Sequence, residues 1–152
     1  MTPAEWLADA VVQMTKWEAV HKSLDEARAA LPSDADREIM RASGNRNLAD
    51  QMDAAERGFA DEMRGLDAQV KRTTVDVQRT VSAMSRADLA SSRAALRGLP
   101  QDLPRVIWAT SLVDERAKAQ VATKQLSLAD RNEVLFPAWL VVAALLFAGT
   151  RR

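Results

Sequence analysis

The chain has 152 residues, enough for one domain, and its 21 basic and 21 acidic side chains give a formal net charge of zero. It contains no Cys and one His. These counts exclude disulfide scaffolds, cysteine zinc sites, iron–sulfur clusters and thiol catalysis, and they leave little for a multi-histidine metal site. Apolar residues make up 47% of the chain, which argues against global disorder.

The composition predicts an all-α fold. Strong helix formers dominate, β-branched residues are sparse, and no Asn-Gly or Asp-Gly hairpin signal occurs. Ala occurs 28 times, and 16 Arg stand against five Lys. This bias is typical of a GC-rich bacterial or phage coding sequence.

Charge is distributed unevenly along the chain. Residues 1–70 hold 14 acidic and 8 basic side chains, whereas residues 71–130 hold 6 acidic and 10 basic ones. The asymmetry is typical of a polarised interaction surface. Internal pairing of acidic with basic helices explains it equally well, and both interpretations stay open.

The first region, residues 1–44, is expected to hold two helices and no signal peptide, since Glu5 and Asp9 stand where a basic and then apolar leader would lie. Thr2 and Pro3 predict an N-cap and first helical position, with the helix running to about Leu31. Its apolar face has helical spacing and comprises Trp6, Ala10, Met14, Trp17, His21, Leu24 and Leu31.

The second helix of this region is expected to be short. Ser33 and Asp36 form a capping-box pattern at its start, and Ser43-Gly44-Asn45 predicts its end. Asp34-Ala-Asp36-Arg-Glu38 resembles the start of a calcium loop, but Ile39 and Asn45 stand where the loop needs Gly and Glu. No metal site is therefore expected there.

Residues 45–98 predict one long amphipathic helix, from about 47 to 96. Apolar residues recur at steps of three and four with an average of 3.6, which indicates a nearly straight helix of about 75 Å. We call the following residues the seam: Leu48, Met52, Phe59, Met63, Leu66, Val70, Val77, Val81 and Met84.

The seam predicts coiled-coil or bundle-like packing with the N-terminal helix folded back along it. A first helix of about 28 residues is too short to cover the whole seam, so we expect homo-oligomers. His21 lies on the apolar face of that first helix, where a polar side chain can specify register. We interpret it as an interfacial rather than a catalytic histidine, and the four Trp residues as packing anchors.

Opposite the seam the long helix carries a basic face with a seven-residue repeat. Guanidinium groups in a row suit the phosphates of lipid or nucleic acid, or an acidic helix, and an ordinary solvated face is the alternative. Aromatic residues are absent from this row, which argues against base stacking. The basic face comprises Arg57, Arg64, Lys71, Arg72, Arg79, Arg86 and Arg93.

Residues 99–133 predict a third helical region that starts at Asp102 and Pro104. Ser127 and Asp130 form a further capping-box pattern, which predicts a new helix before the apolar C-terminal segment. This segment occupies residues 134–152 and ends on two arginines.

The apolar segment carries no charge over the 17 residues from Val134 to Thr150, or about 25 Å of helix. Trp139 near one end and Arg151-Arg152 at the other favour a membrane, whereas Pro137 shortens any uninterrupted helix. Burial in the core of an oligomer is the alternative. The candidate anchor residues are Leu135, Phe136, Trp139, Leu140, Val141, Val142, Leu145, Leu146 and Phe147.

The functional hypotheses follow from these segments. An apolar C-terminal run that closes on Arg-Arg is similar to that of small bacterial tail-anchored, helical inner-membrane proteins. No P-loop, dinucleotide, nucleophile-elbow or zinc-protease motif occurs, so we expect no enzyme, cofactor or small-molecule substrate. Basic residues before the segment (Arg116, Lys118, Lys124, Arg131) favour a cytoplasmic N-terminal region.

The first hypothesis is therefore a non-enzymatic structural or assembly protein, membrane-associated through its C-terminus, whose partners are copies of itself and other structural proteins. The second is a phage protein packed in the virion interior, in a capsid or portal assembly. The third is a helical module that binds nucleic acid.

Overall fold

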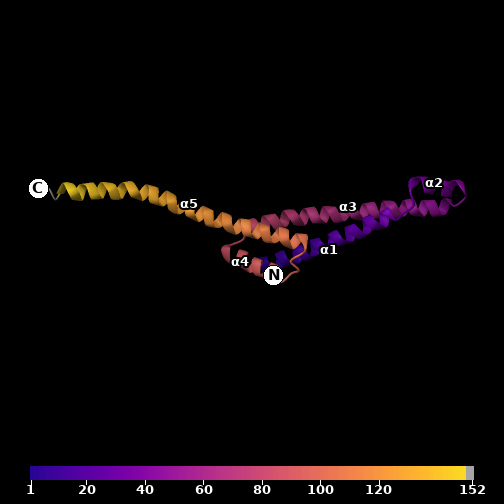
Figure 1. The fold of residues 1–152 in the computed structure, drawn as a ribbon, viewed down its shortest axis with the longest axis horizontal. Helices are drawn as coiled ribbons and strands as arrows, with labels where there is room; N and C mark the ends of the chain where they lie inside the picture. Colours follow the sequence, from indigo (N-terminus) through magenta and orange to yellow (C-terminus); the bar gives the residue numbers. More distant parts are fainter. Residues whose placement is uncertain (150–152) are drawn as a thin grey trace.

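The chain forms an elongated all-helical molecule (Figure 1). The computed structural model describes the backbone of residues 1–149 and the side chains of residues 1–129. This part of the chain contains five helices and no strand, which confirms the all-α prediction. The helices are α1 (Pro3–Ala29), α2 (Asp34–Ala42), α3 (Arg46–Ala83), α4 (Arg86–Arg97) and α5 (Pro104–Gly149).

The first two helices begin where the sequence predicts. The Thr2 hydroxyl accepts a hydrogen bond from the Glu5 N–H at 3.2 Å, and the Glu5 carboxylate accepts one from the Thr2 N–H at 2.8 Å. Ser33 and Asp36 form the same reciprocal pair at α2. Each box satisfies backbone donors that have no partner within the helix. α2 ends at Ala42, and Gly44 takes the positive φ of 96° that a glycine adopts readily.

The predicted single helix from about 47 to 96 is wrong, because the chain breaks between α3 and α4. Met84 has an extended ψ of 140°, and the Ser85 hydroxyl accepts a hydrogen bond from the Asp88 N–H at 3.1 Å. Gln120 of α5 donates a hydrogen bond to the Met84 carbonyl at 2.9 Å. Capping chemistry on both sides of the break therefore stabilises it, and the apolar spacing that carries through Met84 did not reveal it.

The predicted helix start at Ser127 is also wrong. α5 runs without interruption from Pro104 to Gly149, and the Ser127 hydroxyl donates a hydrogen bond to the Lys124 carbonyl one turn earlier at 3.0 Å. A serine that bonds back to its own helix is compatible with a helix interior. The third helical region and the apolar segment are thus one backbone element.

The buried core joins four helices, and we call this part the base bundle. It is formed by the start of α1, the end of α3, all of α4 and the start of α5. Three tryptophans, Trp6, Trp17 and Trp108, pack against it as the sequence predicts. The core residues are Leu7, Ala10, Val11, Met14, Val77, Val81, Met84, Leu89, Leu96, Val106, Ala109 and Val113.

Two extensions leave the base bundle in opposite directions (Figure 1). On one side the rest of α1 folds back antiparallel along α3, with α2 at the far end, and we call this part the arm. On the other side α5 continues alone past the bundle. The N-terminal helix therefore does fold back, but onto a shorter α3 than predicted.

The seam is buried only where the base bundle covers it. Val77, Val81 and Met84 are buried, whereas Leu48 at the other end of α3 is 45% exposed. The members between them, Met52, Phe59, Met63, Leu66 and Val70, are half-buried. A single partner helix covers only part of an apolar stripe, and in the arm α1 is the main partner.

The break at Ser85 gives a first testable prediction. Replacing Ser85 by Ala removes the acceptor for the Asp88 N–H, so we expect the free energy of unfolding to fall by about 0.5–2 kcal/mol. Ser127→Ala is the matched control and should change stability by less than about 0.5 kcal/mol, because Ser127 caps no helix. Urea unfolding followed by circular dichroism measures both. Equal stability of the two variants would contradict the capping role.

Candidate functional site

A groove of about 710 Å³ runs between α1 and α3 on the arm side of the base bundle. Its apolar lining comes from Trp17, Leu66 and Val70, and its rim carries charged side chains of both helices and of α5. His21 lies at this rim, with its Nε2 3.4 Å from Asp67 Oδ1 of α3. The structure thus places the histidine between two helices of the same chain. Its part in an oligomer remains a prediction.

Arg105 fastens the start of α5 to α1 beside this groove. Its Nε donates a hydrogen bond to Glu18 Oε1 at 2.8 Å, and its guanidinium carbon lies 5.4 Å from the Trp108 ring centroid. Arg105 is 22% exposed and Glu18 is 42% exposed, so solvent screens the pair only in part. This contact links α5 to α1 in addition to the core packing of Val106, Ala109 and Val113.

A double-mutant cycle measures how strongly this contact holds the helices together. We expect a coupling free energy of about 0.5–1 kcal/mol between Arg105→Ala and Glu18→Ala, at the upper end for partly exposed ion pairs. The measurement is the difference in unfolding free energy across the four proteins. Coupling within experimental error of zero would show that the pair does not stabilise the contact between α1 and α5.

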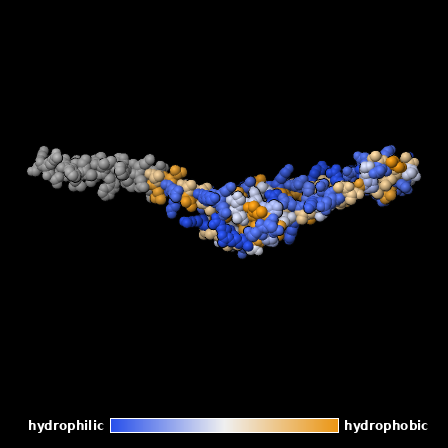
Figure 2. Space-filling model, viewed as in Figure 1, coloured by the Kyte–Doolittle hydropathy of each residue, from blue (hydrophilic) through white to orange (hydrophobic). Residues whose placement is uncertain are grey.

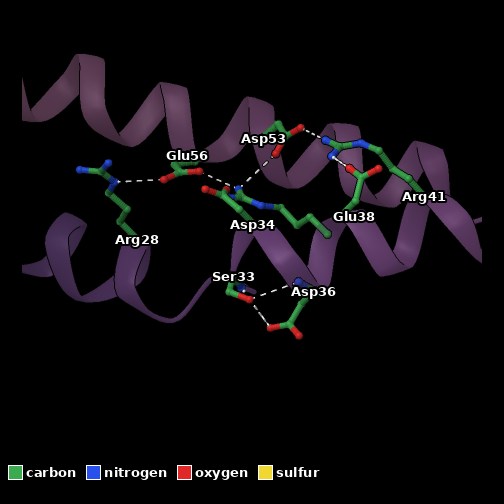
Figure 3. Close-up of polar contacts among 9 residues, drawn as sticks. Arg28, Ser33, Asp34, Asp36, Glu38, Arg41, Asp53 and Glu56 are labelled. Carbon is green, nitrogen blue, oxygen red and sulfur yellow. Dashed lines mark hydrogen bonds and ion pairs between the residues drawn. The ribbon is translucent and has the colours of Figure 1, made fainter.

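The far end of the arm holds a cluster of ion pairs around a buried arginine (Figure 3). Arg37 of α2 is only 4% exposed, and its Nη1 lies 2.6 Å from Glu56 Oε2 and 3.2 Å from Asp53 Oδ1 of α3. Arg37 also bonds to Asp34. Arg28 at the end of α1 approaches Glu56 at 3.5 Å. Charges from three helices therefore meet at one point and fix α2 against the arm.

The carboxylates of the cluster favour the charged form of its arginines. Close contact with Glu56 raises the pKa of Arg37, against the lowering effect of burial, and Asp34 adds to the rise. Glu38 raises the pKa of Arg41 in the same way, with help from Asp53. Asp53 and Glu56 of α3 thus hold α2 in place, whereas Asp34 and Glu38 pair with arginines of α2 itself.

The predicted basic face is split between two helices. Its first five members lie on α3, exposed and opposite the seam, whereas Arg86 and Arg93 lie on α4 beyond the break. Arg64 pairs with Asp61, and Arg93 Nε donates a hydrogen bond to Asp114 of α5 at 2.8 Å. The seven residues are therefore not one continuous row, because the break at Ser85 redirects the last two.

A second groove lies between α4 and α5, and sequence analysis missed it. It has a volume of about 410 Å³ and an apolar floor that includes Leu89, Ala117 and Val121. Arg86, Arg93 and Lys124 line its rim. The signal in the sequence was the apolar spacing of α5, which continues past the bundle at Val121 and Leu128, both about half exposed at 48% and 49%.

The apolar C-terminal segment can be described only in part. The backbone of residues 134–149 belongs to α5, whereas the candidate anchor side chains from Leu135 to Phe147, Trp139 included, and Arg151-Arg152 lie outside the described residues. Among the described residues, no helix meets the length and apolarity that a membrane crossing requires. The same residues contain no cluster of three or more His, Cys, Asp or Glu side chains placed to hold a metal ion.

Comparison of the chain with protein-family models, with curated proteins and with solved structures gives no match. The class of the protein therefore follows from its own architecture. It is an elongated helical protein with a base bundle, an arm whose far end is charged, and a long helix that leads into an apolar segment.

Proposed function

We propose that this chain is a non-enzymatic helical assembly protein that its C-terminal apolar segment attaches to a membrane. The observation that carries the proposal is the continuity of α5. This helix contributes Val106, Ala109 and Val113 to the base bundle and continues to Gly149. A single helix thus connects the core with the run of 17 uncharged residues that begins at Val134.

The charges around the segment support one orientation. Arg116, Lys118, Lys124 and Arg131 precede it within about twenty residues, and Arg151 and Arg152 follow it. An excess of basic residues marks the cytoplasmic side, so we place the base bundle and arm in the cytoplasm. Residues 118–133 extend the helix by roughly 24 Å, and this spaces the bundle from the membrane surface.

Fractionation of the tagged full chain, with and without residues 134–152, tests the proposal. The full chain should sediment with membranes and resist extraction by high salt, since its attachment is hydrophobic. The truncated chain should move to the supernatant. Equal distribution of the two proteins would rule out attachment through this segment.

The virion-interior hypothesis is the second candidate, because an apolar segment on a projecting helix can also be covered by other subunits. Co-purification with capsid or portal proteins instead of membranes would favour it. Nucleic-acid binding receives less support, because the basic face is divided and Arg93 is engaged with Asp114. Binding with a steep salt dependence would be needed to favour it.

A further inference from the structure

The free face of α2 is apolar and flanked by acidic residues. Ala35, Ile39 and Ala42 follow one another at positions i, i+4 and i+7, on the side away from buried Arg37, and Ile39 is 67% exposed. Asp36 and Glu38 stand on either side of this stripe, and Glu38 is 74% exposed. Figure 2 shows hydrophobic surface at this far end of the arm.

The surroundings of this face are acidic as well. Residues 33–56 hold six acidic and three basic side chains. Arg37 and Arg41, two of the three basic ones, are bound within the cluster that fixes α2 to α3. The far end of the arm thus carries a net negative charge around one exposed isoleucine.

The groove between α4 and α5 has the opposite character. Its floor is apolar and its rim is basic. Arg93 of the rim is paired with Asp114, so Arg86 and Lys124 supply the positive charge there. Residues 86–124, which include both walls of the groove, hold seven basic and four acidic side chains. A neighbouring hollow shares Arg93, Ala117 and Val121 with it and adds Lys118. The lining residues span eight positions on each helix, from Arg86 to Arg93 and from Ala117 to Lys124, or about two helical turns.

The apolar face of α2 and the groove between α4 and α5 match in length, polarity and charge, and this match points to one occupant. We propose that α2 of one copy of this chain docks in the α4–α5 groove of a second copy, with Ile39 on the apolar floor and Asp36 and Glu38 facing the basic rim. An amphipathic helix with anchors at i, i+4 and i+7 is a common ligand of such grooves. Complementary charges fix its register and disfavour other partners.

The contact must form between molecules, because α2 lies at the far end of the arm and the groove lies at the base bundle (Figure 1). It joins two different surfaces, so each protomer keeps one free end and copies add head to tail into a ring or a filament. This inference rests on the proposed role in assembly and identifies the contact through which copies of the chain assemble. It does not depend on attachment to a membrane.

Sedimentation of the full chain in mild detergent, over a range of concentrations, provides the test. Ile39→Arg places a cation against the basic rim, and Val121→Glu places an acid against the acidic face of α2. Both positions are at least 48% exposed, so folding should be retained. We expect each variant to weaken self-association by about tenfold or more, as loss of a central anchor does. Wild-type association should weaken as salt rises.

A mixture of the two variants distinguishes this contact from any other. Ile39→Arg keeps an intact groove and Val121→Glu keeps an intact α2 face, so together they make at least one productive contact. The equimolar mixture should recover assembly to two protomers or more at concentrations where each variant alone is largely monomeric. A symmetric contact through the seam or through α5 would not give this result.

Ile107→Arg and Val75→Glu are the matched controls, since both residues are at least half exposed and neither lines the groove. They should assemble as the wild type does. Wild-type chains that remain monomeric, variants that assemble normally, or a mixture that stays monomeric would each overturn the proposal. A further result would also overturn it: Val121→Glu could reduce binding to anionic vesicles while leaving the mass of the assembly unchanged. The groove would then be a surface for lipid headgroups.

Membrane fractionation separates this proposal from the proposed function. Ile39→Arg leaves residues 134–152 intact and should sediment with membranes as the wild type does. A wild-type chain that assembles head to tail but does not pellet with membranes would disprove the membrane attachment alone. A wild-type chain that pellets with membranes but does not assemble would disprove the docking alone.

Discussion

Leu7→Ala is expected to lower the free energy of unfolding by about 2–5 kcal/mol, the range for a buried leucine truncated to alanine. Leu7 is fully buried in the base bundle, where α1 meets α3, α4 and α5. The lost side chain leaves a cavity that four packed helices cannot close without moving. A domain of this size has a total stability of about 5–15 kcal/mol, so the loss is a large fraction of it.

Leu48→Ala is the matched control for this prediction, because Leu48 belongs to the predicted seam but is 45% exposed. We expect it to change stability by less than about 0.5 kcal/mol. Urea titrations in mild detergent measure the two variants, with a shift in midpoint at constant slope taken as a change in stability. A larger effect at Leu48 than at Leu7 would mean that the arm, rather than the base bundle, holds the main core.

Ala143→Arg is expected to release the protein from membranes. Ala143 stands near the middle of the uncharged run from Val134 to Thr150. An arginine there costs about 2.5–3.5 kcal/mol on insertion scales, or roughly a hundredfold in the membrane-bound fraction. Fractionation and sedimentation of the purified variant together measure its location and its assembly.

The outcome also distinguishes lipid from protein as the cover of the segment. A soluble and correctly assembled variant indicates a membrane, whereas an aggregated or dissociated one indicates a protein core in which a charge is left unpaired. Ala119→Arg makes the same substitution at an exposed position of α5 and should change neither readout. If Ala143→Arg also changes neither, the segment is not buried by lipid or by protein.

Local chemistry made the ends of the first two helices predictable from sequence. Thr2 with Glu5 and Ser33 with Asp36 satisfy backbone donors within three residues, so no distant contact is needed to place these helix starts. The all-α class followed from composition in the same way. The charge asymmetry between residues 1–70 and 71–130 was also visible in the sequence, but which charged side chains meet in space was not.

The same local rule gave opposite outcomes at two serines. Ser85 with Asp88 begins a helix, whereas Ser127, which has the same spacing to Asp130, lies within one. Burial decides between them. The break at Ser85 lets Leu89 and Leu96 of α4 enter the base bundle, and the Met84 carbonyl accepts a hydrogen bond from Gln120. Around Ser127 the described side chains of α5 are exposed, so no packing among them favours a break.

The sequence by itself determined that this protein is helical, where its first helices begin, and that its last 17 residues before Arg151 carry no charge. Only the tertiary structure decided where the long apolar stripe is interrupted, which end of the seam is buried, and that Arg37 joins α2 to the arm. The reason is physical. Caps and periodicity depend on neighbours within a few residues, whereas burial depends on which helices meet, and that is fixed by contacts between residues as distant as Glu18 and Arg105.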